Sequence, residues 1–328
     1  MKGDLLKARI YASIRPELER IERAIRRHLS SSVPLIEVVG RYIMESGGKR
    51  LRPLLMVLSS KLCGYQGDQD ADLSVVFEFL HAATLLHDDV VDNAEIRRTR
   101  PAANTLWGNP AVVLVGDFLY SKAILMTVLY NDLRILEVLS ETTTRMAEGE
   151  VLQLIHSDDL ETDEAAYMEV ILRKTAVLMS AACRIGAIFA QAPAAQEKAL
   201  SDYGRHLGLA FQLIDDALDY VGTVDELGKP VGNDLQEGKA TLPLIYAMAH
   251  AEARHRNLIR TVFTAERQTP EDIQALQQLV RELGGVDYTM QRAAEHVAMA
   301  KEKLEVFSPG PTKSLLQDIV DYVLCRRS

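Results

Sequence analysis

Apolar residues recur at helical spacing along most of the chain, and strand-like alternation is scarce. Near the N-terminus, steps of three to five residues join Leu5, Ile10, Ile14, Leu18, Ile21 and Ile25, as in an amphipathic helix. The same reasoning predicts further helices near 73–91, 112–130, 133–157, 163–190, 196–221, 241–265, 270–283, 286–305 and 312–325. We find no sustained period-two pattern rich in Val, Ile and Thr, and no Asn-Gly or Asp-Gly hairpin turn. The pattern therefore predicts an all-α fold.

The helical segments and their breaks indicate one helical bundle. Segments such as 80–87 and 176–190 are apolar or small on nearly every side, which is typical of helices inside a bundle. Breaks are expected at Gly47-Gly48 and in a loop with several Gly and Pro residues from Gly222 to about Lys239. No linker-like tract, low-complexity segment or shift in composition divides the sequence. We expect residues 1–328 to form a single all-α domain.

Composition and charge narrow the function classes. Hydrophobic residues make up 48% of the chain and charged residues 25%, as in soluble globular proteins. The formal net charge is −9 and the pI is near 5.5. This acidic balance argues against a nucleic-acid binder and against broad attraction to an anionic membrane.

Cysteine usage and the absence of long apolar runs point to the cytoplasm. Cys63, Cys183 and Cys325 show no CxxC spacing, so we expect free thiols in a reducing compartment. The first 27 residues carry acids and lack the apolar segment of a secretory signal. The longest charge-free stretch, 101–116, is interrupted by Gly, Asn and Pro. Because a spanning helix needs about 20 apolar residues, no transmembrane segment is expected.

Two acidic clusters with the same spacing follow apolar helical runs. Residues 88–92 read DDVVD and residues 215–219 read DDALD. The outer aspartates of each are four apart and share one helix face, where like charges repel. One such cluster is more often a solvated helix end, but two near a core would be costly without cations. Carboxylate ligands without a His or Cys cluster favour Mg²⁺, with Mn²⁺ as the alternative, over Zn²⁺, and predict a phosphorylated ligand that bridges both clusters.

Basic residues accompany the acidic clusters. Gly47–Pro53 reads GGKRLRP, and Arg97-Arg98 follows the first cluster by five residues. Glycines let the backbone approach a phosphate, and Lys and Arg bind it by charge and hydrogen bonds. Lys174-Thr175 lies within a helical run, and Lys229 and Lys239 flank the loop after the second cluster. Each lysine alone is more often a surface residue, but this loop is typical of a lid that closes over phosphates.

Two uncharged side chains share faces with the acids. His81 lies seven residues before Asp88, and Gln212 lies one turn before Asp216. A lone His on an apolar helix is usually a core residue, yet this one shares the face of the first cluster. Competing phosphate folds lack support, because no P-loop and no GxGxxG after a strand occur. A GxSxG elbow is also absent.

Together these residues resemble the trans-prenyltransferases, most closely the long-chain polyprenyl diphosphate synthases of the octaprenyl type from bacterial quinone biosynthesis. The resemblance covers almost the whole chain and rests on five motifs in order: GGKRLRP at 47–53, FEFLHAATLLHDDVVD at 77–92, Arg97-Arg98, Lys174-Thr175, and FQLIDDALD at 211–219 continuing to residues 228–234. One departure is Thr99, where relatives often carry Gly. The resemblance implies an all-α fold of the isoprenoid synthase type, a central cavity and a homodimer.

The resemblance also implies residue roles. The catalytic residues would be Asp88, Asp89, Asp92, Asp215, Asp216, Lys174 and Gln212. Two or three Mg²⁺ ions per active site would be held by Asp88, Asp92, Asp215 and Asp219. The allylic diphosphate would contact Arg97, Lys174, Thr175, Gln212 and Lys229, with Lys239 beside them. Isopentenyl diphosphate would contact Lys49, Arg52, His81 and Arg98.

The expected reaction is the elongation of an allylic diphosphate, farnesyl or similar, by successive condensations with isopentenyl diphosphate. Ala83 and Thr84, about one turn before Asp88, are small where short-chain relatives place aromatic rings. An open tunnel there predicts a long all-trans product of about seven to nine isoprene units, for use as quinone side chains. We also expect peripheral membrane contact during product release.

Four alternatives remain open. The first is a short-chain synthase of the geranylgeranyl type. A non-catalytic subunit of a heteromeric synthase typically loses aspartates that this chain keeps. A class I terpene cyclase shares the fold class, but the second DDxxD and GGKRLRP favour elongation. A purely structural helical scaffold leaves the acidic clusters unexplained.

Overall fold

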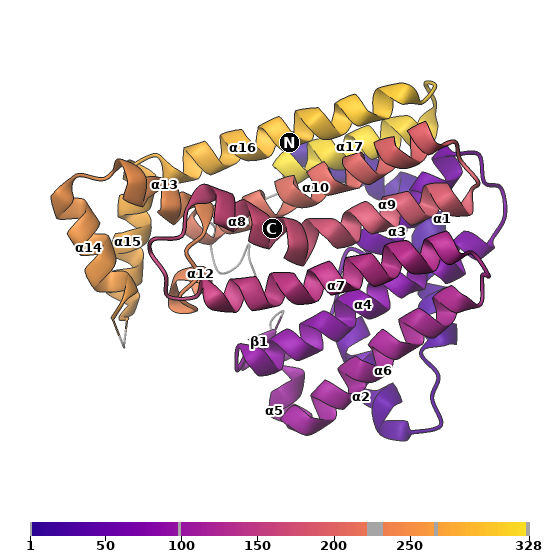
Figure 1. Ribbon diagram of the computed structural model, residues 1–328, viewed down its shortest axis with the longest axis horizontal. Coiled ribbons are helices and arrows are strands. Elements are labelled where there is room, and N and C mark those ends of the chain that lie inside the picture. The colour runs from indigo at the N-terminus through magenta and orange to yellow at the C-terminus, as the bar shows by residue number, and fades with distance from the viewer. Residues whose placement is uncertain (1, 98–99, 222–231, 266–267, 326–328) are drawn as a thin grey trace. The chain divides into compact units, whose positions relative to one another are not determined.

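The computed structural model describes residues 2–97, 100–221, 232–265 and 268–325 and is helical almost throughout, which confirms the all-α prediction (Figure 1). The chain divides into two compact units. Unit 1 comprises Met1–Thr143, Leu178–Gly204 and Lys303–Asp318, and unit 2 comprises Thr144–Val177, Arg205–Glu302 and Ile319–Ser328. The single domain over 1–328 stays a prediction.

Unit 1 is built around α4. Its elements are α1 (Lys2–His28), α2 (Pro34–Glu45), α3 (Leu51–Leu62), α4 (Gln69–Val91), β1 (Ile96–Arg97), β2 (Arg100–Pro101), α5 (Ala103–Trp107), α6 (Asn109–Val128), most of α9 (Val177–Phe189), η2 (Leu304–Val306), and the first parts of α7 (Leu133–Ile155), α10 (Ala194–Val221) and α17 (Pro311–Cys325). α4 packs against α1, α3 and α6. Because Phe77, Phe79 and Leu86 are fully buried, α4 is the core helix of this unit.

α6 is the one described helix that is long and apolar enough to cross a membrane by length and composition, and 39% of its most apolar window is buried. A helix near 112–130 was predicted, but not one of spanning length, because the charge-free stretch ends at residue 116 whereas α6 also contains Asp117 and Lys122. One face, with Val112 and Leu119, is buried, and the helix packs along α4. The apolar character of α6 therefore follows in part from its place in the bundle.

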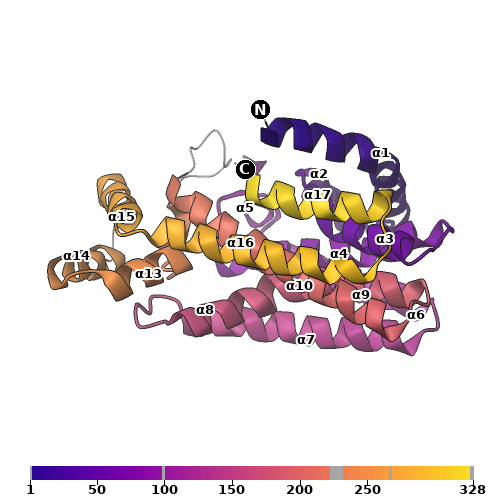
Figure 2. The ribbon, with the colours of Figure 1, turned by 90° about the horizontal axis from the view of Figure 1, so that it is seen from above.

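Unit 2 contains the ends of α7, α10 and α17 together with α8 (Glu164–Ile171), η1 (Leu172–Ala176), α12 (Asn233–Gln236), α13 (Leu242–His250), α14 (Ala253–Phe263), α15 (Pro270–Glu282) and α16 (Gly285–Lys303). Its core cluster joins Tyr220, Leu235, Leu244, Ile259 and Val280 from five of these helices. α14 and α15 pack side by side, as both ribbon views show (Figures 1 and 2). The second acidic cluster therefore ends a helix that is anchored in this core.

The predicted helices agree closely with observed ones, but α3, α5 and α12 lie outside every predicted range. Three further features differ from the prediction. The run 163–190 contains a π-helical turn at Leu172–Ala176, a feature often found at functional sites. The run 241–265 breaks at Ala251 and Glu252, which have extended backbones but no Gly or Pro to signal the break. β1 and β2 form a two-stranded antiparallel ladder, which is too short for any alternating pattern to reveal.

Candidate active site

The first acidic cluster lies at the C-terminal end of α4 in unit 1. Asp92 caps the helix, and its backbone N–H donates to the carbonyl oxygen of Asp88 at 2.8 Å. Asp88 is half-buried and Asp92 is exposed, whereas Asp89 is fully buried. A helix C-terminus carries partial negative charge and disfavours carboxylates, and the last turn of α4 has no basic residue. This arrangement suits a bound cation.

Asp89 has a different environment from its neighbours. Its side chain accepts a hydrogen bond from Arg97 Nε on β1, and its Oδ2 atom is buried without a hydrogen-bond partner among the described residues. Burial raises the pKa of Asp89, while Arg97 opposes that shift. Arg97 is thus oriented by Asp89. Its expected contact with the allylic substrate remains a proposal.

The three basic side chains of the GGKRLRP segment lie in different environments. Arg50 adopts a positive φ of 48° and is buried, and it donates to Glu78 at 2.6 Å and to Glu22 at 2.7 Å. Lys49 is exposed and Arg52 is half-buried. The middle cation therefore has a structural role, while its two neighbours are the ones predicted to bind isopentenyl diphosphate.

The remaining predicted residues of unit 1 lie along α4. His81 and Thr84 are half-buried, and the Thr84 hydroxyl donates to the His81 carbonyl at 2.9 Å. Ala83 is 1% exposed. The α4 helix thus places two small side chains about one turn before Asp88, as the sequence indicated.

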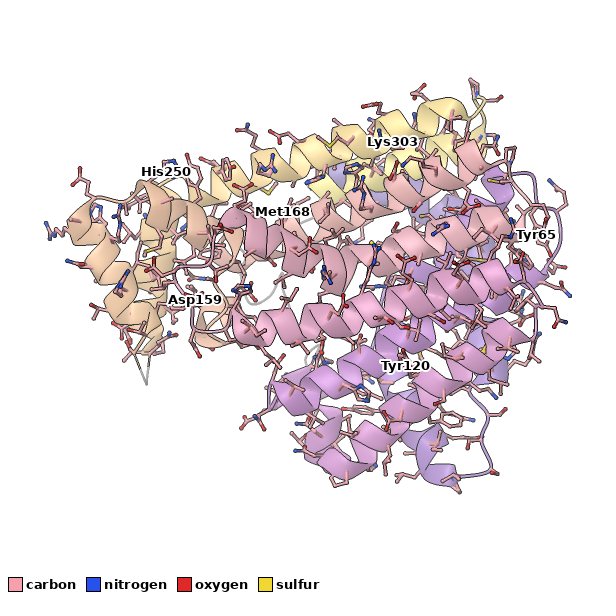
Figure 3. All side chains as sticks on the ribbon, in the orientation of Figure 1. Tyr65, Tyr120, Asp159, Met168, His250 and Lys303 are labelled. Carbon is pink, nitrogen blue, oxygen red and sulfur yellow. The ribbon has the colours of Figure 1, made fainter. Side chains whose placement is uncertain are left out.

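Five predicted residues line one cavity of about 160 Å³ in unit 2. They are Lys174, Thr175, Gln212, Asp216 and Lys239, and the other lining residues are Gln153, His156, Ser157, Thr162, Tyr167, Val170, Ile171, Asp234, Ala240 and Thr241. The cavity thus draws on the end of α7 and the turn after it, on α8, η1, α10 and α12, and on the segment before α13. In Figure 3, Asp159 marks the turn that follows α7, and Met168 marks α8.

The lining of this cavity contains a continuous hydrogen-bond chain. Tyr167 Oη donates to Asp216 Oδ2 at 2.5 Å, and Gln212 Nε2 donates to Asp216 Oδ1 at 2.7 Å. Thr175 Oγ1 donates to Gln212 Oε1 at 2.9 Å. Burial and the adjacent Asp216 raise the pKa of Tyr167 well above its ordinary value, so the phenol keeps its proton. Sequence reasoning missed Tyr167, because no motif contains it.

The two lysines of the cavity are each paired with a glutamate. Lys174 Nζ, in the π-helical turn, donates to Glu150 Oε2 at 2.6 Å, and Lys239 Nζ donates to Glu237 Oε2 at 2.6 Å. Gly149 allows the close approach of α7, because a Cβ there would lie 2.8 Å from the Lys174 backbone nitrogen. Glu150 was not predicted either, since it carries no signal beyond its place on a helix.

The other two aspartates of the second cluster are not among the cavity-lining residues. Asp215 is half-buried. Asp219 is fully buried, and its Oδ2 accepts the Asp234 backbone N–H at 3.0 Å. Asp219 therefore holds the segment that begins α12, whatever else it binds. Arg98 and Lys229, which were predicted to contact substrate, lie outside the described residues, as does Thr99.

The donor set fits a hard divalent cation that is shared with a phosphorylated ligand. Within the described ranges, no group of three or more His, Cys, Asp and Glu side chains is placed to hold a metal ion. Mg²⁺ is usually bound by only one or two carboxylates together with substrate phosphates. Asp88 and Asp92, one turn apart at the end of α4 in unit 1, are a pair of this kind.

Comparison with known proteins identifies relatives along nearly the whole chain. Residues 33–281 match the family described as polyprenyl synthetase. The octaprenyl diphosphate synthase of Haemophilus influenzae is 44% identical over 303 residues, which are 92% of this chain and 91% of that protein. The octaprenyl diphosphate synthase of Escherichia coli is 43% identical over 300 residues, 92% of this chain and 93% of its own.

A solved structure is similar to this fold. The polyprenyl synthase from Caulobacter crescentus CB15, complexed with calcium and isoprenyl diphosphate, superposes with a TM-score of 0.94. It is 40% identical, and the match covers 98% of each chain.

Proposed function

Because this chain belongs to the polyprenyl synthetase family and is a trans-prenyltransferase, we propose that it extends an allylic diphosphate with isopentenyl diphosphate units. The product is a long all-trans polyprenyl diphosphate, which serves quinone side chains. The observation that carries the proposal is the unit 2 cavity, where two lysines lie among hydroxyl, amide and carboxylate groups.

The proposed chemistry begins with the loss of diphosphate from the allylic substrate. Lys174 and Lys239, together with Lys229 and Arg97, hold the diphosphate by charge. Asp88, Asp92, Asp215 and Asp219 would hold two or three divalent cations, Mg²⁺ or Mn²⁺. When bound, these ions would supply further charge stabilisation to the leaving diphosphate. The C–O bond breaks, and its electron pair leaves with the diphosphate.

Carbon–carbon bond formation follows. Lys49, Arg52, His81 and Arg98 hold isopentenyl diphosphate so that its double bond attacks C1 of the allylic cation. A proton then leaves the new cation for the departed diphosphate, which restores a double bond. The oxygens of Thr175 and Gln212 stabilise the cation. The cation must also be kept from bulk water, which would quench it.

Product length is proposed to depend on Ala83 and Thr84. Ala83 is buried on the helix that ends in the first acidic cluster. In the proposed function the growing chain passes this position, and a larger side chain there would block it. The small residues favour a product of about seven to nine isoprene units. The competing proposal is a short-chain synthase, and direct sizing of the product separates the two.

We further propose that the enzyme is a cytoplasmic homodimer with peripheral membrane contact during product release. Leu114, Leu125 and Val128 on α6 are exposed, with exposed fractions of 65%, 55% and 49%. These exposed apolar side chains on one face of α6 support contact with a second copy, because their burial would stabilise the pair. Light scattering gives the mass in solution, and a monomeric mass would contradict the dimer.

The test of the function is incubation with radiolabelled isopentenyl diphosphate, farnesyl diphosphate and Mg²⁺, followed by sizing of the products. A ladder that ends in long polyprenyl chains is expected. A lack of elongation with farnesyl, geranyl and geranylgeranyl primers would overturn the proposal.

A further inference from the structure

Tyr167 is a buried side chain at one end of the hydrogen-bond chain in the unit 2 cavity. It lies on α8, its side chain is 5% exposed, and its hydroxyl meets Asp216 Oδ2 at 2.5 Å. Asp216 itself is only 4% exposed. A phenol that donates to a buried carboxylate satisfies both polar groups, and neither is free to reorient at low cost.

The hydrogen-bond chain runs from Tyr167 through Asp216 and Gln212 to Thr175, and the donor and acceptor at each step are fixed. Asp216 Oδ2 accepts a hydrogen bond from Tyr167, and Asp216 Oδ1 accepts one from Gln212. The hydrogen bond from Gln212 to Asp216 fixes the orientation of the Gln212 amide. If the amide were turned by 180°, its Oε1 atom would face the negatively charged carboxylate. The Gln212 oxygen then accepts the only proton of the Thr175 hydroxyl. Because its proton is used in this hydrogen bond, Thr175 Oγ1 can act toward the cavity only as an acceptor, through its lone pairs.

We propose that Tyr167 is a positioning residue for the condensation, which acts through Asp216 and Gln212 to hold Thr175 Oγ1 as an acceptor in the cavity. The inference rests on the proposed function, in which an electron-poor allylic group forms in this cavity. An oxygen whose proton is already committed faces that group with negative partial charge and needs no reorganisation as the charge develops. Without the phenol, the Asp216 carboxylate and the Gln212 amide lose one fixed contact, so the Thr175 hydroxyl can turn.

The first experiment compares Tyr167→Phe with the wild type in steady-state elongation assays. The variant keeps the buried ring and removes only the hydroxyl. We expect kcat to fall about tenfold and the KM for isopentenyl diphosphate to change less than about twofold, as for loss of an interaction used in the transition state.

The matched control is Tyr203→Phe. Tyr203 is also buried, and its hydroxyl donates to the Leu316 carbonyl at 2.9 Å in unit 1. Removal of that hydroxyl costs a buried hydrogen bond without touching the cavity, so kcat should stay within about twofold. A wild-type kcat for Tyr167→Phe, or an equal loss in both variants, would overturn the inference.

The second experiment tests the coupling through Thr175. We expect Thr175→Val to lower kcat and Thr175→Ser, which retains the hydroxyl, to restore most of it. The double variant Tyr167→Phe/Thr175→Val should lose less than the product of the two single losses, because both act through one chain. Multiplicative losses would overturn the inference. Wild-type protein that elongates no primer would instead overturn the proposed function, and this inference with it.

Discussion

Gly238 lies directly against Asp158. The Asp158 backbone N–H donates to the Gly238 carbonyl at 2.8 Å, Gly238 has a φ of +66°, and a Cβ there would overlap the Asp158 carboxylate. The contact joins the turn after α7 to the segment that carries Lys239. It therefore fixes one wall of the cavity.

Gly238→Ala should destabilise the protein and weaken substrate binding. An L-residue at this φ costs about 1–2 kcal/mol, and the overlap with Asp158 would displace Lys239. We expect a lower urea midpoint and a severalfold higher KM for farnesyl diphosphate. Gly310→Ala is the control, because a Cβ at Gly310 meets no atom within 4 Å. Equal KM values for both variants would contradict this account of Lys239.

Arg50 and Lys49 should respond differently to alanine, although they are neighbours. Arg50→Ala leaves Glu78 buried without its partner, and breaking a buried ion pair costs about 3–5 kcal/mol. Lys49→Ala should change the free energy of unfolding by less than about 0.5 kcal/mol but raise the KM for isopentenyl diphosphate. Urea unfolding and steady-state kinetics on both variants test this separation. If both lose only stability, the assignment of Lys49 to substrate is wrong.

Ala83→Tyr should shorten the product. Thin-layer chromatography of the labelled products should show much shorter chains than in the wild type. Overpacking also costs about 1–3 kcal/mol, so a control of similar burial is needed. Ala82→Tyr serves, since Ala82 is 4% exposed and points about 100° away around α4. An unchanged product ladder for Ala83→Tyr, or equal shortening in both, would contradict the role of Ala83.

His296 should make stability fall at acidic pH. Burial, with the neighbouring His206, lowers the pKa of His296 from 6.5 to about 4, and the two Nδ1 atoms lie 3.0 Å apart. Between pH 6.5 and 4 the unfolded chain takes up a proton that the folded chain does not, so the free energy of unfolding falls as the pH decreases. We expect a loss of about 1–3 kcal/mol from this group by pH 4 and none above pH 6.5. Urea midpoints of His296→Gln should fall less steeply over that window, and parallel curves would refute the assignment.

Removal of divalent cations should abolish elongation. EDTA-treated protein is expected to show no product, and added Mg²⁺ or Mn²⁺ should restore it. Substitution of the exposed Asp92 by Asn should raise the Mg²⁺ concentration needed for half-maximal rate. Full activity in EDTA would contradict the role of both acidic clusters.

Much of the fold was predictable, because apolar spacing reports which helix faces are buried. The segment 80–87, which is apolar on nearly every side, lies on α4, the core helix of unit 1. The short β1–β2 ladder and the break at Ala251 were not predictable, since neither has a periodic pattern or a Gly or Pro signal. A backbone that changes direction at an alanine depends on the packing of Ala251, which is 5% exposed, and that packing is not local.

Some residues of the candidate site were also predictable from the sequence, and others were not. Helical spacing was enough to group Gln212 with Asp216, and both line the cavity with Lys174 and Thr175. Tyr167 and Glu150 were missed because their partners lie on other elements and residue type alone does not indicate such pairs. Arg50 shows the converse, since its buried role depends on a positive φ that distinguishes it from Lys49 and Arg52.

The acidic ends of α4 and α10 also affect the stability of the folded protein when divalent cations are scarce. Carboxylates crowded at the negative pole of a helix lower the free energy of unfolding, and a cation that binds only the folded chain returns that stability in proportion to the logarithm of its concentration. Starvation for divalent metal would then do more than stop catalysis. It would shorten the lifetime of the folded chain against proteases, so metal supply would set the amount of enzyme as well as its rate.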